Sequence, residues 1–378
     1  MIIGVPKEVF EGESRTPMVP DTIRKLSAQD ANIVVEAGIG ASIGITDQAY
    51  VDAGATIETD RTKLLGESDL VLRLRKPAIE EIPLLKKGSI HVSFLDPFNE
   101  HELVDAFAAA DITAISMEMV PRITRAQKMD ALSSQANLAG YVMVILAAER
   151  LDSILPMMMT PAGTISPSRV FIIGAGVAGL QAVATAKRLG ARVDAFDTRP
   201  VVKEQVESLG GKFVEIDLGE TGQTEGGYAK ALTAEQIEMQ KAGQAKVMAQ
   251  SDIVITTAQL FGRPAPRIVT KEMIEGMKPG SIIIDMAVDS GGNVEGSEPD
   301  KEVLINDVKV IGYSNLPGRA AKNASDMYAS NLANLVLEFW DKEEKTFQLN
   351  MEDEILQGCV ITHGGEMVNE MIKNIRNK

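Results

Sequence analysis

A glycine-rich turn between two apolar runs constrains the fold of this chain more than any other feature. Residues 170–173 are all apolar and lead into Gly174, Gly176 and Gly179, which have the spacing Gly-x-Gly-x-x-Gly. A helix-like segment and a second apolar run follow, and that run ends on Asp197. A strand, a tight turn, a helix and a second strand with an acid at its end are the parts of a dinucleotide-binding β-α-β unit.

Each of these positions has a physical task in such a unit. Gly174 permits the tight turn, Gly176 lets the backbone approach a pyrophosphate, and Gly179 lets the helix lie close to the strand. The free N–H groups at the helix N-terminus then face the phosphates. Asp197 can accept a hydrogen bond from a ribose 2′-hydroxyl but repels a 2′-phosphate, a preference that the nearby Arg199 can soften. The pattern therefore predicts NAD(H) rather than NADP(H). The alternative is a glycine-rich helix start in an ordinary α/β protein.

Length and charge limit the kind of protein this can be. The 378 residues are enough for two domains. A net charge of −15 argues against a nucleic-acid-binding protein, which needs a basic face. Cys359 is the only cysteine, and we expect it to be a small buried residue. The apolar stretch at residues 141–148 stops at Glu149 and Arg150, short of the roughly 18 residues that span a membrane. We therefore expect a cytoplasmic chain without direct membrane insertion.

Strand-like and helix-like segments alternate along most of the chain, which predicts an α/β fold with mainly parallel sheets. Strands are expected at residues 2–5, 33–36, 70–74, 90–94, 113–117, 170–173, 193–196, 212–216, 253–257, 281–285 and 308–311, and helices at residues 21–29 (capped by Asp21), 46–53, 129–149, 234–249, 271–277 and 327–341. We expect two Rossmann-like domains, separated by a cleft and bridged by the two long helices. The predicted domains are a discontinuous N-terminal α/β domain, residues 1–133 plus 322–378, and a dinucleotide-binding domain, residues 134–321.

A polar loop before the first long helix carries candidate binding residues. It contains Arg122, Gln127 and Asp130, and it follows a predicted strand. Loops at the carboxyl ends of parallel strands usually hold the binding residues of α/β proteins. Arg122 can hydrogen-bond a carboxamide or phosphate oxygen, and Gln127 and Asp130 can orient a nicotinamide amide. The alternative, which the pattern supports equally, is a solvated loop in which Asp130 only favours the helix start.

Other segments have less specific patterns. Residues 226–230, which include Tyr228, suggest either a hinged loop that closes on a ligand or a plain surface loop. Residues 256–259 and 284–287 are strand ends in the dinucleotide domain, where ribose and nicotinamide usually lie. The methionine run at residues 157–159 is interpreted as flexible core packing, with an apolar surface lining the cleft as the alternative.

Side-chain acid–base catalysis has little support in the sequence. The three histidines, His91, His101 and His363, form neither a triad nor a metal-ligand spacing, so no metal site is expected. A dehydrogenase that oxidises an alcohol or an amine needs a proton acceptor beside the reacting carbon. Hydride exchange between two nicotinamides needs none; it needs an approach to roughly 3–3.5 Å and the exclusion of water. The missing acid–base pair therefore favours hydride exchange.

Taken together, these segments resemble the NAD(H)-binding alpha-subunit part (domain I) of proton-translocating nicotinamide nucleotide transhydrogenase. The match runs nearly end to end. It is carried by residues 4–8, 121–130, 133, 156–160, 174–179, 203–213, 226–230 and 278–281. The loop at residues 121–130 and the Gly-Gly-Tyr segment are specific to that family.

The resemblance implies direct hydride transfer from NADH bound here to NADP⁺ on a separate subunit. The family's loop arginine, glutamine and aspartate fall on Arg122, Gln127 and Asp130. NAD(H) contacts are expected at Ser133, Gly174, Gly176, Val177, Gly179, Asp197, Thr198, Arg199, Tyr228, Thr257, Ala258, Gln259 and Ala287. The implied partners are a second copy of the chain in a homodimer, an NADP-binding subunit and membrane-spanning subunits that couple transfer to proton translocation. The chain would be held at the inner membrane only through those partners.

Alanine dehydrogenase shares the Gly-Val-Pro-Lys-Glu opening and is the closest alternative. That family uses a lysine at the end of one early strand and a histidine after the next. Here the lysine position is Arg75 or Lys76, and residues 94–97 lack the histidine. This departure argues against amino-acid oxidation. A third hypothesis, from a different class, is a non-catalytic NAD-sensing or scaffold protein.

Overall fold

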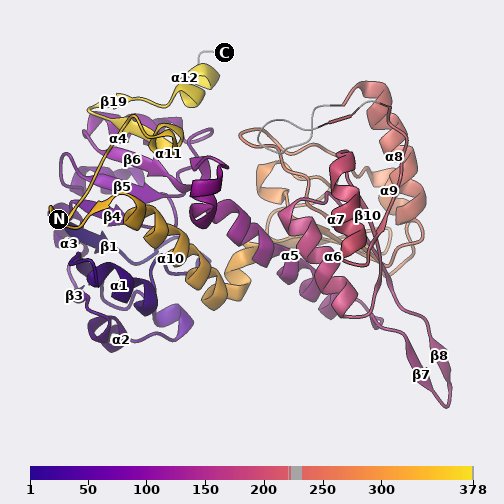
Figure 1. The fold of residues 1–378 in the computed structure, drawn as a ribbon. Helices are drawn as coiled ribbons and strands as arrows, with labels where there is room; N and C mark the ends of the chain where they lie inside the picture. The colour runs from indigo at the N-terminus through magenta and orange to yellow at the C-terminus, as the bar shows by residue number, and fades with distance from the viewer. Residues whose placement is uncertain (220, 223–231, 377–378) are drawn as a thin grey trace. The chain divides into compact units, whose positions relative to one another are not determined.

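The chain forms two compact units. The computed structural model describes residues 1–219, 221–222 and 232–376. The first unit consists of Met1–Gln135 and Gly318–Lys378, and the second unit is Ala136–Pro317 (Figure 1). The chain passes from the first unit into the second within helix α5, Ala131–Arg150.

An eight-stranded sheet forms the centre of the first unit, with the strand order β19-β18-β6-β5-β4-β1-β2-β3. Strands β1 to β6 pair in parallel, whereas β18 and β19 are antiparallel additions at one edge. The strands are β1 Ile2–Val5, β2 Asn32–Glu36, β3 Thr56–Glu58, β4 Leu70–Leu72, β5 Ile90–Ser93, β6 Thr113–Ser116, β18 Val360–His363 and β19 Glu366–Met367. Strands β4, β5 and β6 are buried along their whole length, as in a parallel sheet covered on both faces.

The first unit also contains the following helices. They are α1 Pro20–Ser27, α2 Asp47–Asp52, α3 Arg61–Glu67, α4 His101–Ala109, α10 Ala321–Glu338, α11 Glu354–Cys359 and α12 Glu370–Arg376, with 3₁₀ helices η1 Ala41–Ile43, η2 Ile79–Leu84, η3 Met117–Met119 and η4 Thr124–Met129. The predicted cap at Asp21 is wrong: Val19 is the N-cap and Pro20 takes the first helical position, where a missing N–H costs no bond. The expectation of a buried Cys359 is confirmed.

The second unit is built on a seven-stranded sheet in the order β11-β10-β9-β12-β13-β15-β14. Its strands are β9 Arg169–Ile173, β10 Arg192–Phe196, β11 Lys212–Phe213, β12 Ile253–Thr256, β13 Ile282–Asp285, β14 Lys301–Ile305 and β15 Val308–Gly312. The chain moves outward in one direction through β9, β10 and β11 and in the other through β12, β13 and β15. The strand order therefore reverses between β9 and β12, and such a switch point is where open α/β sheets bind ligands. The predicted α/β class with parallel-rich sheets is confirmed.

Helices α6 Val177–Arg188, α7 Lys203–Ser208, α8 Ala234–Met248 and α9 Lys271–Glu275 belong to this unit, with 3₁₀ helices η5 Pro200–Val202 and η6 Val288–Ser290. Helix η7, Leu316–Ala320, follows at the boundary with the first unit. Apolar residues from the sheet, among them Phe171, Val254 and Ile283, form one core with Met248 of α8 and Ile274 of α9. The alternation of strand and helix thus gives a doubly wound sheet with a continuous core.

Several element boundaries differ from the predicted ones. Helix α5 begins at Ala131 rather than residue 129, because a 3₁₀ turn precedes it and Asp130 caps it. Helix α10 begins at Ala321, before its apolar periodicity becomes visible. It ends at Glu338, because the following residues pair in the small hairpin β16 Trp340–Asp341 and β17 Thr346–Phe347. The antiparallel edge strand β14 was not expected.

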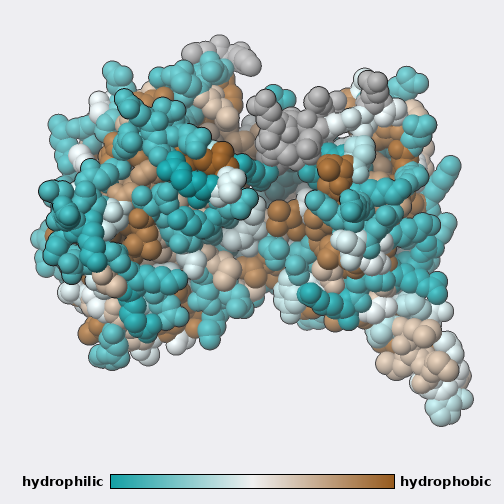
Figure 2. Space-filling view, in the orientation of Figure 1, coloured by the Kyte–Doolittle hydropathy of each residue, from teal (hydrophilic) through white to brown (hydrophobic). Residues whose placement is uncertain are grey.

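The methionine run is exposed, so its interpretation as core packing is wrong. Strands β7 Met158–Thr160 and β8 Gly163–Ile165 form a two-stranded antiparallel hairpin that projects from the rest of the second unit (Figure 1). Met157 is 60% exposed, Met158 45% and Met159 76%. Figure 2 shows this projection as a tan, weakly apolar surface. Apolar side chains on a two-stranded ribbon have no core to enter, because such a ribbon is too thin to bury both faces.

Helix α5 is the one helix among the described residues with the length and composition to cross a membrane. The uninterrupted apolar stretch in the sequence is shorter than a membrane span, but the mean hydropathy over the helix is high. Half of the relevant window of α5 is buried within the protein, and core helices pass the same test.

Candidate nucleotide site and its comparison with known proteins

The glycine turn between β9 and α6 has the geometry that its spacing predicts. Gly174 adopts a φ of 97°, and its N–H donates to the Phe196 carbonyl of β10 at 2.8 Å. A Cβ on Gly179 would lie 1.9 Å from the Gly174 carbonyl oxygen, so any side chain there would force α6 away from the turn. Gly176 is the N-cap of α6 and is followed by Val177. Among the described residues, the one atom within 4 Å of a Cβ on Gly176 is a guanidinium nitrogen of Arg199 at 3.9 Å, which leaves room for a ligand beside this glycine.

Asp197 at the end of β10 is joined directly to this turn. Its Oδ2 accepts the Ala175 N–H at 2.7 Å and the Arg199 Nη2–H at 2.7 Å. Its Oδ1 accepts the Arg199 backbone N–H at 2.9 Å and the Arg199 Nε–H at 2.8 Å. The hydrogen bonds that the Arg199 guanidinium donates to Asp197 raise the pKa of that guanidinium. The acid is therefore positioned at the glycine turn, with its charge balanced by the adjacent arginine.

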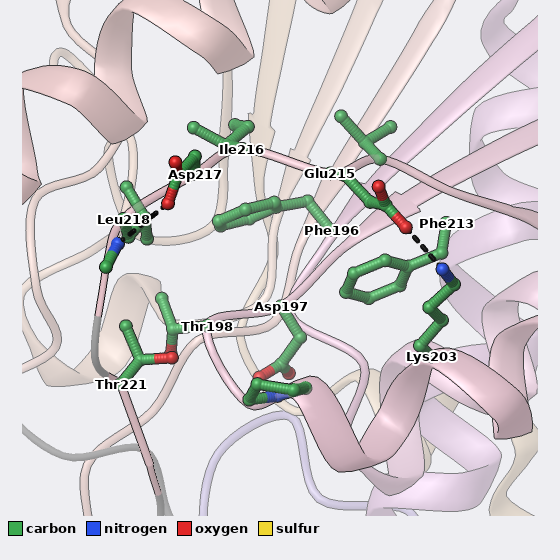
Figure 3. Close-up of a pocket in the computed structure, with 13 residues that line it drawn as sticks. Phe196, Asp197, Thr198, Lys203, Phe213, Glu215, Ile216, Asp217, Leu218 and Thr221 are labelled. Atoms are coloured by element: carbon green, nitrogen blue, oxygen red, sulfur yellow. Dashed lines mark hydrogen bonds and ion pairs between the residues drawn. The ribbon is translucent and has the colours of Figure 1, made fainter.

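A pocket of about 240 Å³ opens next to Asp197 (Figure 3). Its wall is formed by Phe196, Asp197, Thr198, Pro200, Lys203, Phe213, Val214, Glu215, Ile216, Asp217, Leu218, Gly219 and Thr221. An ion pair between Lys203 and Glu215 lies on one side, and the Asp217 carboxylate accepts the Gly219 N–H at 3.1 Å on the other (Figure 3). The sequence reasoning missed this pocket because it assigned residues 212–216 to one strand. The strand ends at Phe213, and the following apolar residues instead line a cavity beside the acid.

The loops after β12 and β13 brace the turn from the other side. Thr257 Oγ1 donates to the Gly174 carbonyl at 2.9 Å. Ala258 donates its N–H to Asn293 Oδ1 at 3.1 Å and accepts from Asn293 Nδ2 at 2.8 Å. Asn293 is fully buried, and its Nδ2 also donates to the Pro266 carbonyl at 2.9 Å. Asn293 was not predicted from the sequence, where an asparagine directly after two glycines was the only available signal.

A buried carboxylate fixes the loop that carries Asn293. Asp285, fully buried at the end of β13, accepts the N–H groups of Ala287 at 3.0 Å, Asn293 at 3.2 Å and Val294 at 3.1 Å. Ala287 is also fully buried, whereas Gln259 is exposed. The predicted residues Thr257, Ala258 and Ala287 thus share one network with Gly174, and Gln259 lies at its surface. Tyr228 and the rest of residues 226–230 lie outside the described residues.

The predicted loop of the first unit forms η4 and the start of α5. Asp130 caps α5: its Oδ1 accepts the Ser133 N–H at 2.8 Å and its Oδ2 accepts the Ser133 hydroxyl at 2.6 Å. Arg122 and Gln127 are exposed. Ala126 and Met129 are buried and fasten the loop to the first unit. The structure therefore shows the capping role of Asp130, while Arg122 and Gln127 are exposed residues of the same loop.

Arg75 and Lys76, the two candidates for the lysine position of the alanine dehydrogenase alternative, both form ion pairs within the first unit. Arg75 Nε donates to Glu13 at 2.8 Å, and Lys76 pairs with Glu100 and, at 3.6 Å, with Asp96. His91 is fully buried inside β5, and burial, together with Arg73, lowers its pKa well below the usual value. A neutral histidine enclosed in a strand cannot serve as a proton acceptor for a substrate. Residues 1–219, 221–222 and 232–376 contain no cluster of three or more metal-ligating side chains.

Comparison with known proteins agrees with this geometry. The N-terminal domain model of the alanine dehydrogenase/PNT family matches residues 4–139, and its C-terminal domain model matches residues 143–370. The chain is 45% identical over 376 residues to the first of the alpha-subunit polypeptides of NAD(P) transhydrogenase from Rhodospirillum rubrum, with 98% of each chain covered. It is 30% identical over 298 residues to the alanine dehydrogenase of Bacillus subtilis, covering 78% of this chain and 72% of the other.

A solved structure of a transhydrogenase from Sinorhizobium meliloti superposes with a TM-score of 0.88 at 44% identity, covering 97% of this chain and 100% of that one. Both halves of this chain match, at a level of identity well above that needed for common ancestry. The resemblance inferred from the motifs is therefore confirmed, and the chain belongs to the alanine dehydrogenase/PNT family.

Proposed function

We propose that this chain is the NAD(H)-binding component of a Re/Si-specific, proton-translocating transhydrogenase and that hydride passes from its NADH to NADP⁺ on a partner subunit. The observation that carries the proposal is the contact of 2.7 Å between the Asp197 carboxylate and the Ala175 N–H. In dinucleotide-binding units an acid at this position accepts a ribose 2′-hydroxyl beside the turn that binds the pyrophosphate, and this contact supports the same roles for Asp197 and the glycine turn. The transhydrogenase subunits among the relatives support this choice within the family.

In this proposal each unit has its own role. In the second unit, the free N–H groups at the start of α6 bind the pyrophosphate, and Asp197 and the adjacent pocket take the adenosine half. The nicotinamide supplies the hydride. In the first unit, the proposal assigns to Arg122, Gln127 and Asp130 the orientation of a nicotinamide carboxamide, with Ser133 bonded to Asp130. NADH loses a hydride and becomes NAD⁺, and NADP⁺ gains that hydride and becomes NADPH, so no side chain has to accept or release a proton.

Direct transfer can be measured by stopped-flow absorbance. The full chain is mixed with the NADP(H)-binding partner subunit, and NADPH on the partner reduces an oxidised nicotinamide analogue that absorbs at a shifted wavelength once reduced. We expect rapid transfer that depends on both proteins. NADH binding without any transfer would instead indicate the NAD-sensing alternative. Alanine-dependent reduction of NAD⁺ by the chain alone would indicate an alanine dehydrogenase-like enzyme, an outcome that the pairing of Lys76 with Glu100 argues against.

The homodimer belongs to the same proposal, and the exposed hairpin β7–β8 supports it. Met158, Met159 and Ile165 are exposed, as is every other residue of strands β7 and β8. A second copy of the chain would cover these side chains and remove them from water. We expect Met159→Asp to shift the chain from dimer to monomer in analytical ultracentrifugation, whereas Thr164→Asp on the same hairpin should have a smaller effect. A monomeric wild-type chain at micromolar concentration would refute this assignment.

The remaining partners follow from the proposed reaction. Membrane-spanning subunits would couple the transfer to proton translocation and hold the chain on the cytoplasmic side of the inner membrane. Tyr228, which lies outside the described residues, is proposed as a contact of the bound nucleotide because the family resemblance assigns it that role. We expect Tyr228→Ala to weaken NADH binding by about 1 kcal/mol or less, as for one loop contact. An unchanged dissociation constant would remove Tyr228 from the site.

A further inference from the structure

A buried asparagine on α10 holds the loop that carries the candidate catalytic residues. Asn331 is 7% exposed and lies in the first unit, as the loop does. Its Nδ2 donates to the Lys128 carbonyl at 3.0 Å, and its Oδ1 accepts the Ser134 hydroxyl at 2.7 Å. Because a carbonyl oxygen can only accept, the orientation of the amide is fixed by its partners. Asn331 thus uses both ends of its side chain on the same short stretch of chain.

The two contacts lie on either side of Asp130. Lys128 is in the last turn of η4, and Ser134 is in the first turn of α5. Between them, the Asp130 N–H donates to the Gln127 carbonyl at 3.3 Å, and the Ser134 N–H donates to the Asp130 carbonyl at 3.2 Å. Residues 127–134 are therefore linked to one another by short-range hydrogen bonds. Asn331, on α10, adds one bond at Lys128 and one at Ser134. Loss of either Asn331 bond would weaken the attachment of the junction to α10.

The other polar contacts between α10 and this loop are more exposed. Asn334 Nδ2 also donates to the Lys128 carbonyl at 3.0 Å, but at the surface. Lys128 Nζ pairs with Glu338 at 2.7 Å while its own side chain is 51% exposed. Exposed ion pairs contribute little to the position of a loop, because water and salt screen them, whereas a buried amide left without its partner carries the full cost of desolvation.

We infer that Asn331 is a positioning residue for hydride transfer, acting through the Lys128–Ser134 junction on Gln127 and Asp130. The inference rests on the proposed function of the loop. Asn331 lies in the first unit, whereas the glycine turn, Asp197 and the adjacent pocket belong to the second. A change at Asn331 should therefore slow transfer without an equal loss of NADH affinity. A shift of the reacting groups by about 1 Å can cost up to ~10²-fold in rate.

Two substitutions test the two hydrogen bonds of the Asn331 side chain separately. Asn331→Asp keeps an acceptor for the Ser134 hydroxyl but turns an oxygen toward the Lys128 carbonyl, so that the two oxygens repel. Ser134→Ala removes the other contact, together with the bond of the same hydroxyl to the Ala131 carbonyl at 3.1 Å, and places no repelling charge at the junction. Asn334→Ala is the matched control, because it deletes an amide bonded to the same carbonyl from the surface. Each variant is tested as the full chain with its partner subunit, by stopped-flow transfer from NADPH to the nicotinamide analogue, and NADH affinity is measured by calorimetry.

We expect Asn331→Asp to reduce the transfer rate constant at saturating nucleotide by about tenfold or more, and Ser134→Ala by about threefold, with NADH dissociation constants within about twofold of the wild type. Asn334→Ala should transfer at nearly the wild-type rate. The inference is overturned if the Asn331→Asp variant transfers normally, or if its rate falls only in proportion to weakened binding. If Asn331→Asp does not fold, an unchanged rate for Ser134→Ala overturns it. A wild-type chain that binds NADH but transfers no hydride would instead overturn the proposed function.

Discussion

Asp197 and Arg199 form a bidentate ion pair in which every acceptor position of the carboxylate is occupied. Three of its four donors come from Arg199 and one from the Ala175 N–H. A carboxylate offers about four lone-pair positions, so a ribose 2′-hydroxyl can donate to Asp197 only after the guanidinium has moved. The guanidinium already lies beside Gly176 at the start of α6. Binding of a ribose 2′-hydroxyl at Asp197 would therefore require an exchange of hydrogen-bond partners at this carboxylate.

This exchange predicts how selectivity responds to substitution. Arg199→Ala should increase the preference for NADH over NADPH by about tenfold, because the acid alone then faces the 2′-phosphate. Asp197→Asn should reduce the preference, because the charge that repels the phosphate is gone while the arginine remains. Calorimetric titration of each variant with both nucleotides gives the ratio of dissociation constants. Equal affinity of the wild type for NADH and NADPH would contradict the assigned role of Asp197.

Asn293 should matter for NADH binding. Its amide fixes Ala258, whose neighbour Thr257 contacts the glycine turn, so Asn293→Ala should let this loop withdraw. We expect the NADH dissociation constant to rise roughly tenfold, in line with about 1–3 kcal/mol for buried groups that lose their partner. Asn306→Ala is the matched control, since Asn306 is an exposed asparagine of the same unit that also bonds a backbone carbonyl. Unchanged NADH affinity, together with a lowered melting temperature, would show that Asn293 supports stability alone.

Arg122→Ala should slow hydride transfer more than it weakens NADH binding. The side chain extends from an exposed loop of the first unit, where its proposed task is to orient a carboxamide. The transfer rate at saturating nucleotide and the NADH dissociation constant, measured on the same preparation, distinguish the two effects. A variant with weaker binding but a normal saturated rate would assign Arg122 to binding instead. Arg125→Ala serves as the comparison, because Arg125 is tied to Asp353 at 2.6 Å.

Glu13 should make the first unit sensitive to acid. Burial alone would raise the pKa of Glu13, but its hydrogen bonds and ion pairs with Arg15 and Arg75 outweigh burial and lower the pKa to about 2. Because the folded-state pKa is lower than the unfolded value of 4.5, the stabilisation is present above pH 4.5 and is lost as the pH falls toward 2. Its size is on the order of 3 kcal/mol.

The variant Glu13→Gln isolates this contribution. In urea unfolding at pH 7 it should be less stable than the wild type, and the gap between the two should narrow as the pH falls below about 4.5. Other carboxylates titrate in both proteins and cancel in the difference. A gap that stays constant from pH 7 to pH 3 would show that the charge of Glu13 contributes nothing to stability.

The features that could be predicted from the sequence are those that depend on residues close to one another in the chain. The glycine turn was predictable because Gly174 needs a positive φ and Gly179 cannot carry a side chain, and both demands fall within one β-α-β unit. Asn293 and Asn331 were not, because their partners are 35 and 203 residues away in the chain. The methionine run was misread because hydropathy records that a residue is apolar and not whether a core exists to receive it. The pocket beside Asp197 was missed because it depends on where β11 ends.

The order of strands in the first unit has a consequence for biosynthesis. Strand β18 pairs with β6, and Thr362 bonds both the Ile112 carbonyl, at 2.8 Å, and the Ala114 N–H, at 3.1 Å. Ribosomes deliver the chain from the N-terminus, so β6 leaves the exit tunnel with its edge unpaired and must wait for about 240 residues before β18 arrives. The second unit is a single uninterrupted stretch and can fold during that interval. Nascent chains stalled before β18 should therefore expose an open sheet edge, the kind of surface that chaperones bind and that aggregation exploits.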